Sequence, residues 1–185
     1  LKNKTVEQLQ ELQQLGLKLI YVGAESGDDQ VLSCIDKGEA FASTLDGLIK
    51  AKQAGIKTSV MLINGIGGVQ YSEQHALASA QLINQAQPDY LATLVLFSRR
   101  GDERLVQGYG GEFETLSQRQ LFQEMELFLS NLKLERTIFR SDHASNFLVL
   151  KGVLNRDLET MLAQLRRVID TPERVFLRGN SQRSL

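Results

Sequence analysis

Residues 17–27, LKLIYVGAESG, decide the fold of this chain. They begin as an apolar, strand-like run and end abruptly at Gly23-Ala24-Glu25-Ser26-Gly27, which places a carboxylate at the carboxyl end of a strand. Ligands bind at such strand ends in α/β folds, because the neighbouring loops leave a crevice there. The alternative is an ordinary strand-to-helix turn in which Ser26 or Asp28 caps the next helix.

The same pattern occurs twice more along the chain. A helix over residues 41–54, closed by Gly55, is followed by the apolar run IKTSVMLINGIGG. A helix over residues 72–86 then ends before Pro88 and Asp89, and the run YLATLVLF follows it. Alternation of strands and helices is typical of a parallel sheet, so strands near residues 17–23, 57–64 and 90–97 are expected to end at one edge.

The remaining segments predict further helices and one short strand. Thr5-x-x-Gln8 and Ser117-x-x-Gln120 have the spacing of capping boxes, and they open helices that begin near residues 5 and 118. A final strand over residues 137–140 and a helix over residues 156–169 are expected beyond a glycine-rich link at residues 108–111. We therefore predict an α/β fold: part of a (β/α) barrel over residues 1–107, a packed extension over 108–171 and a disordered tail over 172–185.

Composition excludes several classes of protein. Of the 185 residues, 42% are hydrophobic and 23% are charged, which is typical of a globular protein, and the formal net charge is -1. A net charge so close to zero does not support a nucleic-acid partner, although it does not exclude one. No apolar run approaches the roughly 20 residues of a membrane span and no signal segment opens the chain, so a cytoplasmic location without a membrane partner is expected.

The sequence contains a single cysteine, Cys34, and two histidines, His75 and His143. This set makes an internal disulfide impossible and a zinc site improbable. It also cannot hold an iron–sulfur cluster, which needs several thiolates. Cys34 lies at apolar spacing beside Val31 and Leu32, which favours a small buried side chain.

The order of these motifs resembles the C-terminal half of radical S-adenosylmethionine proteins. The resemblance covers residues 9–165 and is carried by GAESG, a basic residue at Lys37, and the runs AGIKTSVMLINGIGG, PDYLATLVLF and RSDHASNFLVLKGVL. Among the branches of that superfamily, the sequence is most similar to the oxygen-independent coproporphyrinogen oxidase-like proteins. The resemblance implies half of a radical SAM barrel, with parallel strands inside and helices outside.

The resemblance also implies a cofactor site for S-adenosylmethionine. It places Glu25 at the ribose hydroxyls, which a carboxylate can accept together, and Lys37 at the methionyl carboxylate. Side-chain alternation puts Ser59, Met61 and Ile63 on one face of their strand, and we assign that face to the cofactor as a polar supplement and an adenine wall. The alternatives are that Lys37 is a solvated loop charge and that Met61 and Ile63 are core residues.

Four further residues are candidates for binding substrate. Arg99 and Arg100 follow the third strand, where related proteins carry Pro-Gly-Thr, and either hold substrate carboxylates or form a charged surface loop. His143 and Asn146 belong to the densest polar cluster, and each is either close to the substrate or structural. His75 is expected to be a partly buried surface histidine.

The chain begins at Leu1 and lacks the CxxxCxxC loop that holds the 4Fe-4S cluster in this family. We therefore expect an excised piece of a larger parent, in which the missing N-terminal half is the partner of this chain and carries the cluster. The parent would be an enzyme that cleaves S-adenosylmethionine and acts on an unidentified substrate, and this piece alone would be inactive. The alternative is a cluster-less binding or scaffold protein derived from a barrel.

Overall fold

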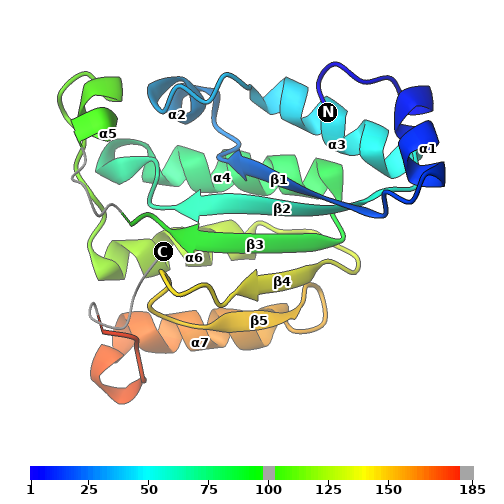
Figure 1. Ribbon diagram of the computed structural model, residues 1–185. Coiled ribbons are helices and arrows are strands. Elements are labelled where there is room, and N and C mark those ends of the chain that lie inside the picture. Colours follow the sequence, from blue (N-terminus) through cyan, green and yellow to red (C-terminus); the bar gives the residue numbers. More distant parts are fainter. Residues whose placement is uncertain (98–102, 180–185) are drawn as a thin grey trace.

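The computed structural model describes residues 1–97 and 103–179 (Figure 1). The α-helices are α1 (Val6–Gln14), α2 (Asp29–Cys34), α3 (Phe41–Gln53), α4 (Gly68–Ala86), α5 (Glu103–Gly108), α6 (Gln118–Ser130) and α7 (Leu158–Asp170). The strands are β1 (Leu19–Glu25), β2 (Lys57–Asn64), β3 (Tyr90–Val95), β4 (Ile138–Ser141) and β5 (Leu150–Val153). A short 3-10 helix, η1 (Pro172–Arg174), follows α7.

The five strands form one sheet in the order β1-β2-β3-β4-β5. The first four strands are parallel, and β5 returns antiparallel to β4. The carboxyl ends of β1, β2 and β3 therefore meet at one edge, as Figure 1 shows by its arrowheads. The architecture is α/β, with a mostly parallel, partly open barrel-like sheet, as the sequence predicted.

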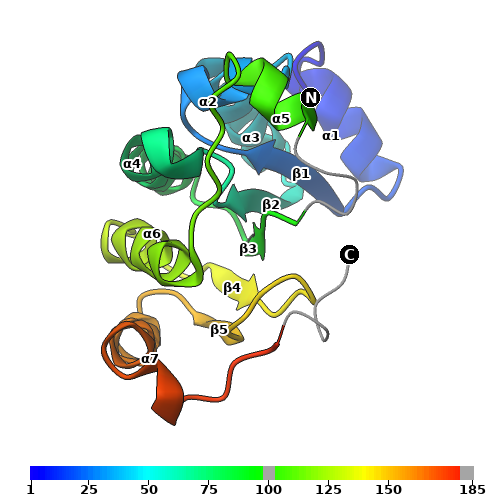
Figure 2. The same cartoon turned by 90° about the vertical axis from the view of Figure 1, so that its left-hand side faces the viewer.

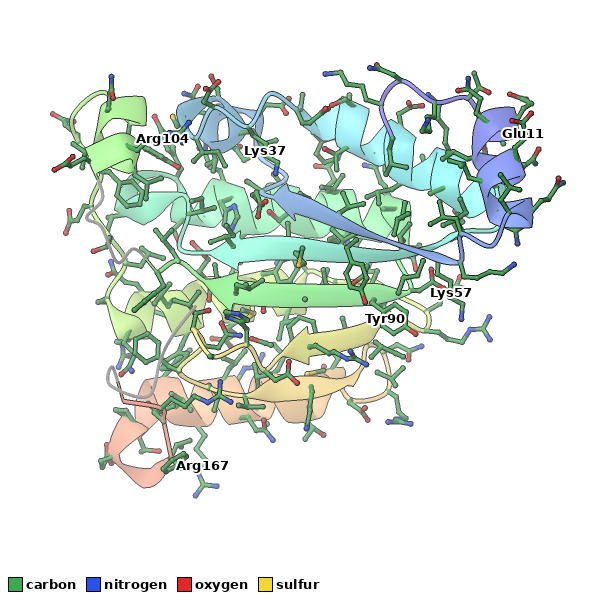
Figure 3. All side chains as sticks on the ribbon, in the orientation of Figure 1. Glu11, Lys37, Lys57, Tyr90, Arg104 and Arg167 are labelled. Carbon is green, nitrogen blue, oxygen red and sulfur yellow. The ribbon has the colours of Figure 1, made fainter. Side chains whose placement is uncertain are left out.

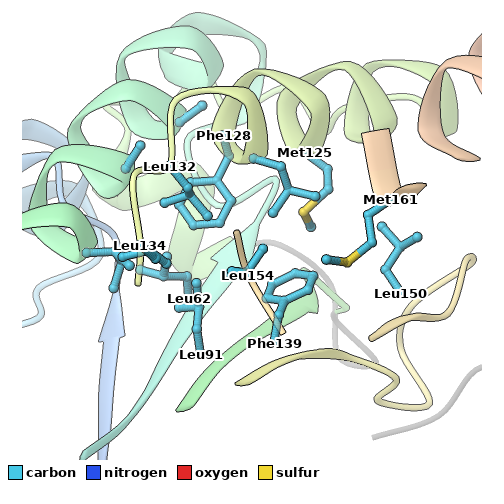
Figure 4. Close-up of a cluster of buried hydrophobic side chains, with 14 of the residues drawn as sticks. Leu62, Leu91, Met125, Phe128, Leu132, Leu134, Phe139, Leu150, Leu154 and Met161 are labelled. Atoms are coloured by element: carbon cyan, nitrogen blue, oxygen red, sulfur yellow. The ribbon is translucent and has the colours of Figure 1, made fainter. Parts of the chain in front are cut away.

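Helices cover one face of the sheet, and the core lies between them. In Figure 2, α4, α6 and α7 lie together on one side of the strands. Figure 4 shows Leu62, Leu91 and Phe139 of the sheet packed toward Phe128 of α6 and Met161 of α7. Leu91 and Phe139 have no exposed surface, and burial of side chains of this size stabilises the fold by about 1.5–3 kcal/mol each.

The opposite face of the sheet, here called the open face, is less covered. Tyr21 is 72% exposed, and Met61, Ile63 and Tyr90 are partly exposed, whereas Val60 and Leu62 on the helix-covered face are buried. In a barrel the face away from the helices is the interior. The set Ser59, Met61 and Ile63 therefore lies on the interior side, where the alternation in the sequence placed it.

Most predicted elements are confirmed. Both capping boxes are present, at Thr5 with Gln8 and at Ser117 with Gln120. Asp28, one of the two residues proposed as a helix cap, accepts a hydrogen bond from the backbone N–H of Val31. The strand expected over 17–23 runs from Leu19 to Glu25.

Three details differ from the sequence prediction. The helical spacing of Val6, Leu9, Leu12 and Leu15 predicts that all four lie on one buried face of the first helix, but Leu15 is 84% exposed. Helix α4 begins at Gly68 rather than at 72, because the carbonyl of Glu114, from a distant segment, accepts the N–H of Val69 in the extra first turn. Strand β5 was not predicted, because four residues that include Gly152 carry little strand signal and are fixed by pairing with β4.

The C-terminal part of the chain is continuous with the sheet. Helix α6 packs against α4, and β4 pairs with β3, so residues after the glycine-rich link extend the same layers. The expected tail begins with η1, and residues 180–185 lie outside the described residues. None of the helices described in residues 1–97 and 103–179 is long and apolar enough to cross a membrane.

Candidate functional site

The carboxyl end of β1 carries an irregular backbone at Glu25. The register with β2 shifts there, so that Gly23 pairs with Met61 and Glu25 pairs with Leu62. Glu25 has a φ of 61°, a left-handed backbone conformation that residues other than glycine rarely adopt. Such strained positions persist only where surrounding contacts impose them, and they concentrate at functional sites.

Glu25 and Lys37 meet at this strand end. Lys37 Nζ lies 2.9 Å from Glu25 Oε1, and the two side chains are 28% and 23% exposed. A Cβ atom on Gly23 would lie 2.5 Å from Glu25 Oε1, so the carboxylate covers the place that a side chain at position 23 would fill. Figure 3 shows Lys37 beside this end of β1. Two of the predicted cofactor residues are thus brought together by the fold.

The other predicted cofactor residues share the face on which Glu25 lies. Residues paired across parallel strands point to the same face, so Gly23 and Met61 share one, and Ser59 and Ile63 follow it by alternation. The Glu25 carboxylate over Gly23 therefore lies on the same face as Ser59, Met61 and Ile63. Met61 lies directly opposite Gly23 in the strand pairing. Ser59 instead pairs with Tyr21, two residues before Gly23, and is only 7% exposed.

Helix α4, on the helix-covered face of the sheet, holds the loop that follows Glu25 by hydrogen bonds. Ser26 Oγ lies 2.8 Å from His75 Nδ1, and the backbone N–H of Gly27 donates to Ser79 Oγ at 2.9 Å. Gln74 Nε2 donates to Asp28 Oδ1 at 3.1 Å. These contacts fix residues 26–28 and so impose the left-handed backbone of Glu25.

A buried carboxylate extends this network to the end of β2. Glu124 of α6 is 4% exposed and accepts hydrogen bonds from Asn64 Nδ2 and Gly65 N–H, both at 2.6 Å. It also accepts from Ser72 Oγ at 2.5 Å, and His75 Nε2 lies 3.9 Å away. One connected set of polar groups therefore positions the loops after both β1 and β2.

Burial determines the charge of His75 within this network. The side chain lies under the sheet, which lowers the pKa of His75 below its ordinary value of 6.5, although the nearby carboxylates of Glu124 and Asp28 act in the opposite direction. His75 is therefore neutral at pH 7. The sequence interpretation of a partly buried surface histidine was wrong, because only 4% of this residue is exposed.

Asn146, in the polar cluster at residues 140–146, is buried and fully hydrogen-bonded to neighbouring strands and turns. Asn146 is 2% exposed, and its Nδ2 donates to the Thr93 carbonyl at 2.8 Å and to Ser141 Oγ at 2.9 Å. Its Oδ1 accepts the N–H of Val95 at 2.7 Å, so the amide joins the ends of β3 and β4. This placement fits the structural alternative for Asn146.

The second candidate in that cluster, His143, is partly exposed at the turn after β4. Its Nδ1 accepts the N–H of Ser145 at 3.1 Å, and Arg178 donates to its carbonyl at 2.7 Å. The other substrate candidates, Arg99 and Arg100, lie outside the described residues.

Sequence reasoning missed Glu124 and the role of His75. The position of Glu124 could have revealed its role. It falls between Leu121 and Phe128 at the spacing of the apolar face of α6. A carboxylate on an apolar helix face indicates a buried charge with dedicated donors.

The described residues offer no metal centre. Across residues 1–97 and 103–179, His, Cys, Asp and Glu side chains nowhere form a group of three or more that could hold an ion. Cys34 is partly exposed rather than buried, and its sulfur accepts a hydrogen bond from Gln30 Nε2 at 3.5 Å.

Comparisons with known proteins bear on the fold and on one segment of the chain. The family model described as "Radical SAM superfamily" matches residues 3–80, which hold α1, β1, α2, α3, β2 and the first part of α4. None of the curated proteins matches the chain closely enough to count as a relative.

A solved structure of Elp3 from the archaeon Methanocaldococcus infernus, with residues 1–46 deleted, has a similar fold. The TM-score is 0.56 at 17% sequence identity, and the similarity covers 85% of this chain and 38% of the Elp3 chain. The chain therefore spans well under half the length of that protein. Residues 3–80 carry a radical SAM superfamily match, and they lie within a fold similar to that of Elp3.

Proposed function

We propose that this chain provides an S-adenosylmethionine-binding surface of a radical SAM enzyme. The observation that supports this proposal is the Glu25–Lys37 pair, held on the open face at the carboxyl end of β1 within the segment that matches the superfamily. Glu25 would accept the ribose hydroxyls, and Lys37 would bind the methionyl carboxylate. The coproporphyrinogen oxidase-like branch and the cytoplasmic location stay predictions.

The donor set on the open face fits this cofactor. Glu25 is an acceptor, Lys37 is a cation, and the partly exposed Met61 and Ile63 offer an apolar wall for adenine. The absence of a side chain at Gly23 leaves room for the Glu25 carboxylate beside Met61. When bound, S-adenosylmethionine would supply the radical chemistry that removes a hydrogen atom from a substrate.

The 4Fe-4S cluster does not fit the residues of this chain. Its single cysteine, Cys34, lies on α2, where it accepts a hydrogen bond from Gln30. A cluster of this kind is held by several thiolates, so the ligands must come from another segment or another chain.

We propose that the segment or chain that carries the cluster ligands attaches at the free edge of β1. Among the described residues, β1 pairs only with β2, on one side, and a groove of about 330 Å³ runs along β1. The groove is lined by Tyr21, Val22 and Gly23 of β1 and by Ser43, Thr44 and Gly47 of α3. An unpaired strand edge accepts a further strand through its backbone groups.

Binding of S-adenosylmethionine to this chain tests the proposal. Isothermal titration calorimetry of the wild type should show weak binding, and Glu25→Gln should raise Kd at least about tenfold, because it removes a charged acceptor while keeping the size of the side chain. Glu11→Gln, which removes a carboxylate from the exposed face of α1, is the matched control and should leave Kd unchanged.

Two results would contradict the proposal. Equal affinity of the wild type and Glu25→Gln would remove Glu25 from the site. Absence of any S-adenosylmethionine binding, by this chain and by a longer parent, would favour the cluster-less scaffold instead.

A further inference from the structure

Two cations face each other on the open face of the sheet, away from Glu25 and Lys37. Arg140 of β4 is the direct antiparallel partner of Lys151 of β5, and both side chains are exposed. Partners in an antiparallel pair point to the same face. That face is the open one, because Arg140 pairs with Ala92 of β3, which pairs with Met61 of β2.

These residues form one row across the sheet. The register aligns Gly23, Met61, Ala92, Arg140 and Lys151 on five successive strands. The Glu25 carboxylate lies over the first residue of this row, and the two cations end it. With strands about 4.8 Å apart, Arg140 lies about 14 Å from Gly23 along the sheet, which is the reach of a small organic molecule.

The two cations lack an anionic partner within the described residues. Across residues 1–97 and 103–179, no carboxylate lies within ion-pair distance of Arg140 or Lys151, and this includes Asp142, which follows β4. Like charges directly opposite each other destabilise a strand pair. The sheet therefore keeps an arrangement that an anion would relieve.

Protection of a sheet edge does not explain this pair. An exposed lysine on an edge strand, such as Lys151 on β5, discourages edge-to-edge pairing. Arg140 lies on β4, which is paired on both sides, so it has no edge to protect. Its guanidinium instead lies 5.6 Å from the centre of the Tyr90 ring, a cation–π contact that holds it over the sheet.

We propose that Arg140 and Lys151 form an anion-binding subsite that takes the acidic group of a small organic substrate. The apolar body of that molecule would cover Ala92 and Met61, and its far end would approach the ligand at Glu25. Arg140 can grip a carboxylate or a phosphate bidentately, and Lys151 adds a point charge. The assignment of this ligand as substrate rests on the proposed function, whereas the anion subsite does not.

Three probes with one apolar body test the subsite on the 185-residue chain. 1-Naphthylacetate carries a carboxylate, 1-naphthyl phosphate carries a phosphate, and 1-naphthylacetamide is neutral. Titrations followed by ¹⁵N-resolved NMR should show an anion bound at least about tenfold more tightly than the amide, with shifts at Ala92, Arg140 and Lys151. The Kd of the anion should rise with added sodium chloride.

The double variant Arg140→Gln/Lys151→Gln should raise the Kd of the anion at least about tenfold, to that of the amide. Lys18→Gln/Lys57→Gln, which removes two exposed lysines at the other end of the sheet, is the charge-matched control and should leave that Kd unchanged. Whichever of 1-naphthylacetate and 1-naphthyl phosphate binds more tightly shows whether the subsite prefers a carboxylate or a phosphate.

Equal binding of the anions and the amide, or undiminished anion binding by Arg140→Gln/Lys151→Gln, would overturn the subsite. The proposed function is tested separately, by the effect of Glu25→Gln on S-adenosylmethionine. A chain that binds the anions but not S-adenosylmethionine would keep the subsite and lose the proposed function. The reverse result would lose the subsite alone.

Discussion

The hydroxyl of Ser26 lies 2.8 Å from Nδ1 of His75, and this contact ties the loop at the carboxyl end of β1 to helix α4. The N–H of Asp28 donates to Ser26 Oγ at 2.9 Å. The Ser26 hydroxyl accepts this N–H and can donate its own proton to Nδ1 of a neutral imidazole. The hydrogen bonds from Asp28 to His75 are then complete without a charge on His75.

Acidification is expected to destabilise the fold through His75. Burial lowers its pKa in the folded state, so between the unfolded pKa near 6.5 and the lower folded pKa the unfolded chain binds more protons. The contribution of this histidine is fully present above pH 6.5 and falls with pH by up to about 1.4 kcal/mol per unit. Urea unfolding between pH 7.5 and pH 5 measures the slope.

The variant His75→Gln identifies the source of that slope. Gln has no titratable ring, so the variant should be less stable at pH 7.5 and should show a flatter dependence on pH. His143→Gln retains His75 and is expected to keep the slope of the wild type. An unchanged slope in His75→Gln would show that other groups cause the acid sensitivity.

Gly23, near the end of β1, and Gly27, in the loop after it, should respond differently to a methyl group. In Gly23→Ala the nearest atoms to the new Cβ are the ends of the Glu25 and Lys37 side chains, which can shift, so stability should change by less than about 0.5 kcal/mol while the Glu25–Lys37 pair is displaced. In Gly27→Ala the Cβ meets the backbone carbonyl of Ala78, which cannot move freely, and a loss of about 1–3 kcal/mol is expected.

Chemical denaturation and calorimetry together check this contrast. Gly23→Ala should weaken S-adenosylmethionine binding in a chain of normal stability. A large loss of stability in Gly23→Ala, or none in Gly27→Ala, would contradict the placement of Glu25 above Gly23 and of Gly27 against α4.

Asn146 should prove important for stability. Asn146→Ala leaves the N–H of Val95, the Thr93 carbonyl and the Ser141 hydroxyl without this partner in a buried site, and a loss of about 2–4 kcal/mol is expected. His143→Ala, at a partly exposed position in the same turn, should cost no more than about 1 kcal/mol. Equal effects on the urea midpoint would contradict a structural role for Asn146.

Anaerobic reconstitution with iron and sulfide should leave this chain without a four-iron cluster. Its one thiol, Cys34, cannot replace the several thiolates that a cluster requires. The same chain should form no 5′-deoxyadenosine from S-adenosylmethionine. Iron counting and a 5′-deoxyadenosine assay measure the two results, and stoichiometric iron on this chain would overturn the argument.

Local patterns in the sequence determined the parallel strands and their order. Apolar runs that end at Gly23, Gly65 and Ser98, separated by capped amphipathic helices, leave few arrangements other than a parallel sheet with helices on one face. Alternation along β2 also determined that Ser59, Met61 and Ile63 share a face, because the side-chain period of a strand is two. The position of Glu25 at a strand end followed from the same pattern.

Tertiary structure alone decided which of these groups meet. The Glu25–Lys37 contact depends on a left-handed backbone that α4 and α6 impose through Ser26, His75 and Glu124, which are far apart in sequence. The row from Gly23 to Lys151 depends on the register of five strands, one of which, β5, has almost no signal of its own. The period of the side chains along a strand shows which face of the sheet a residue occupies. Only the packing of distant segments decides which residue of another strand lies next to it on that face.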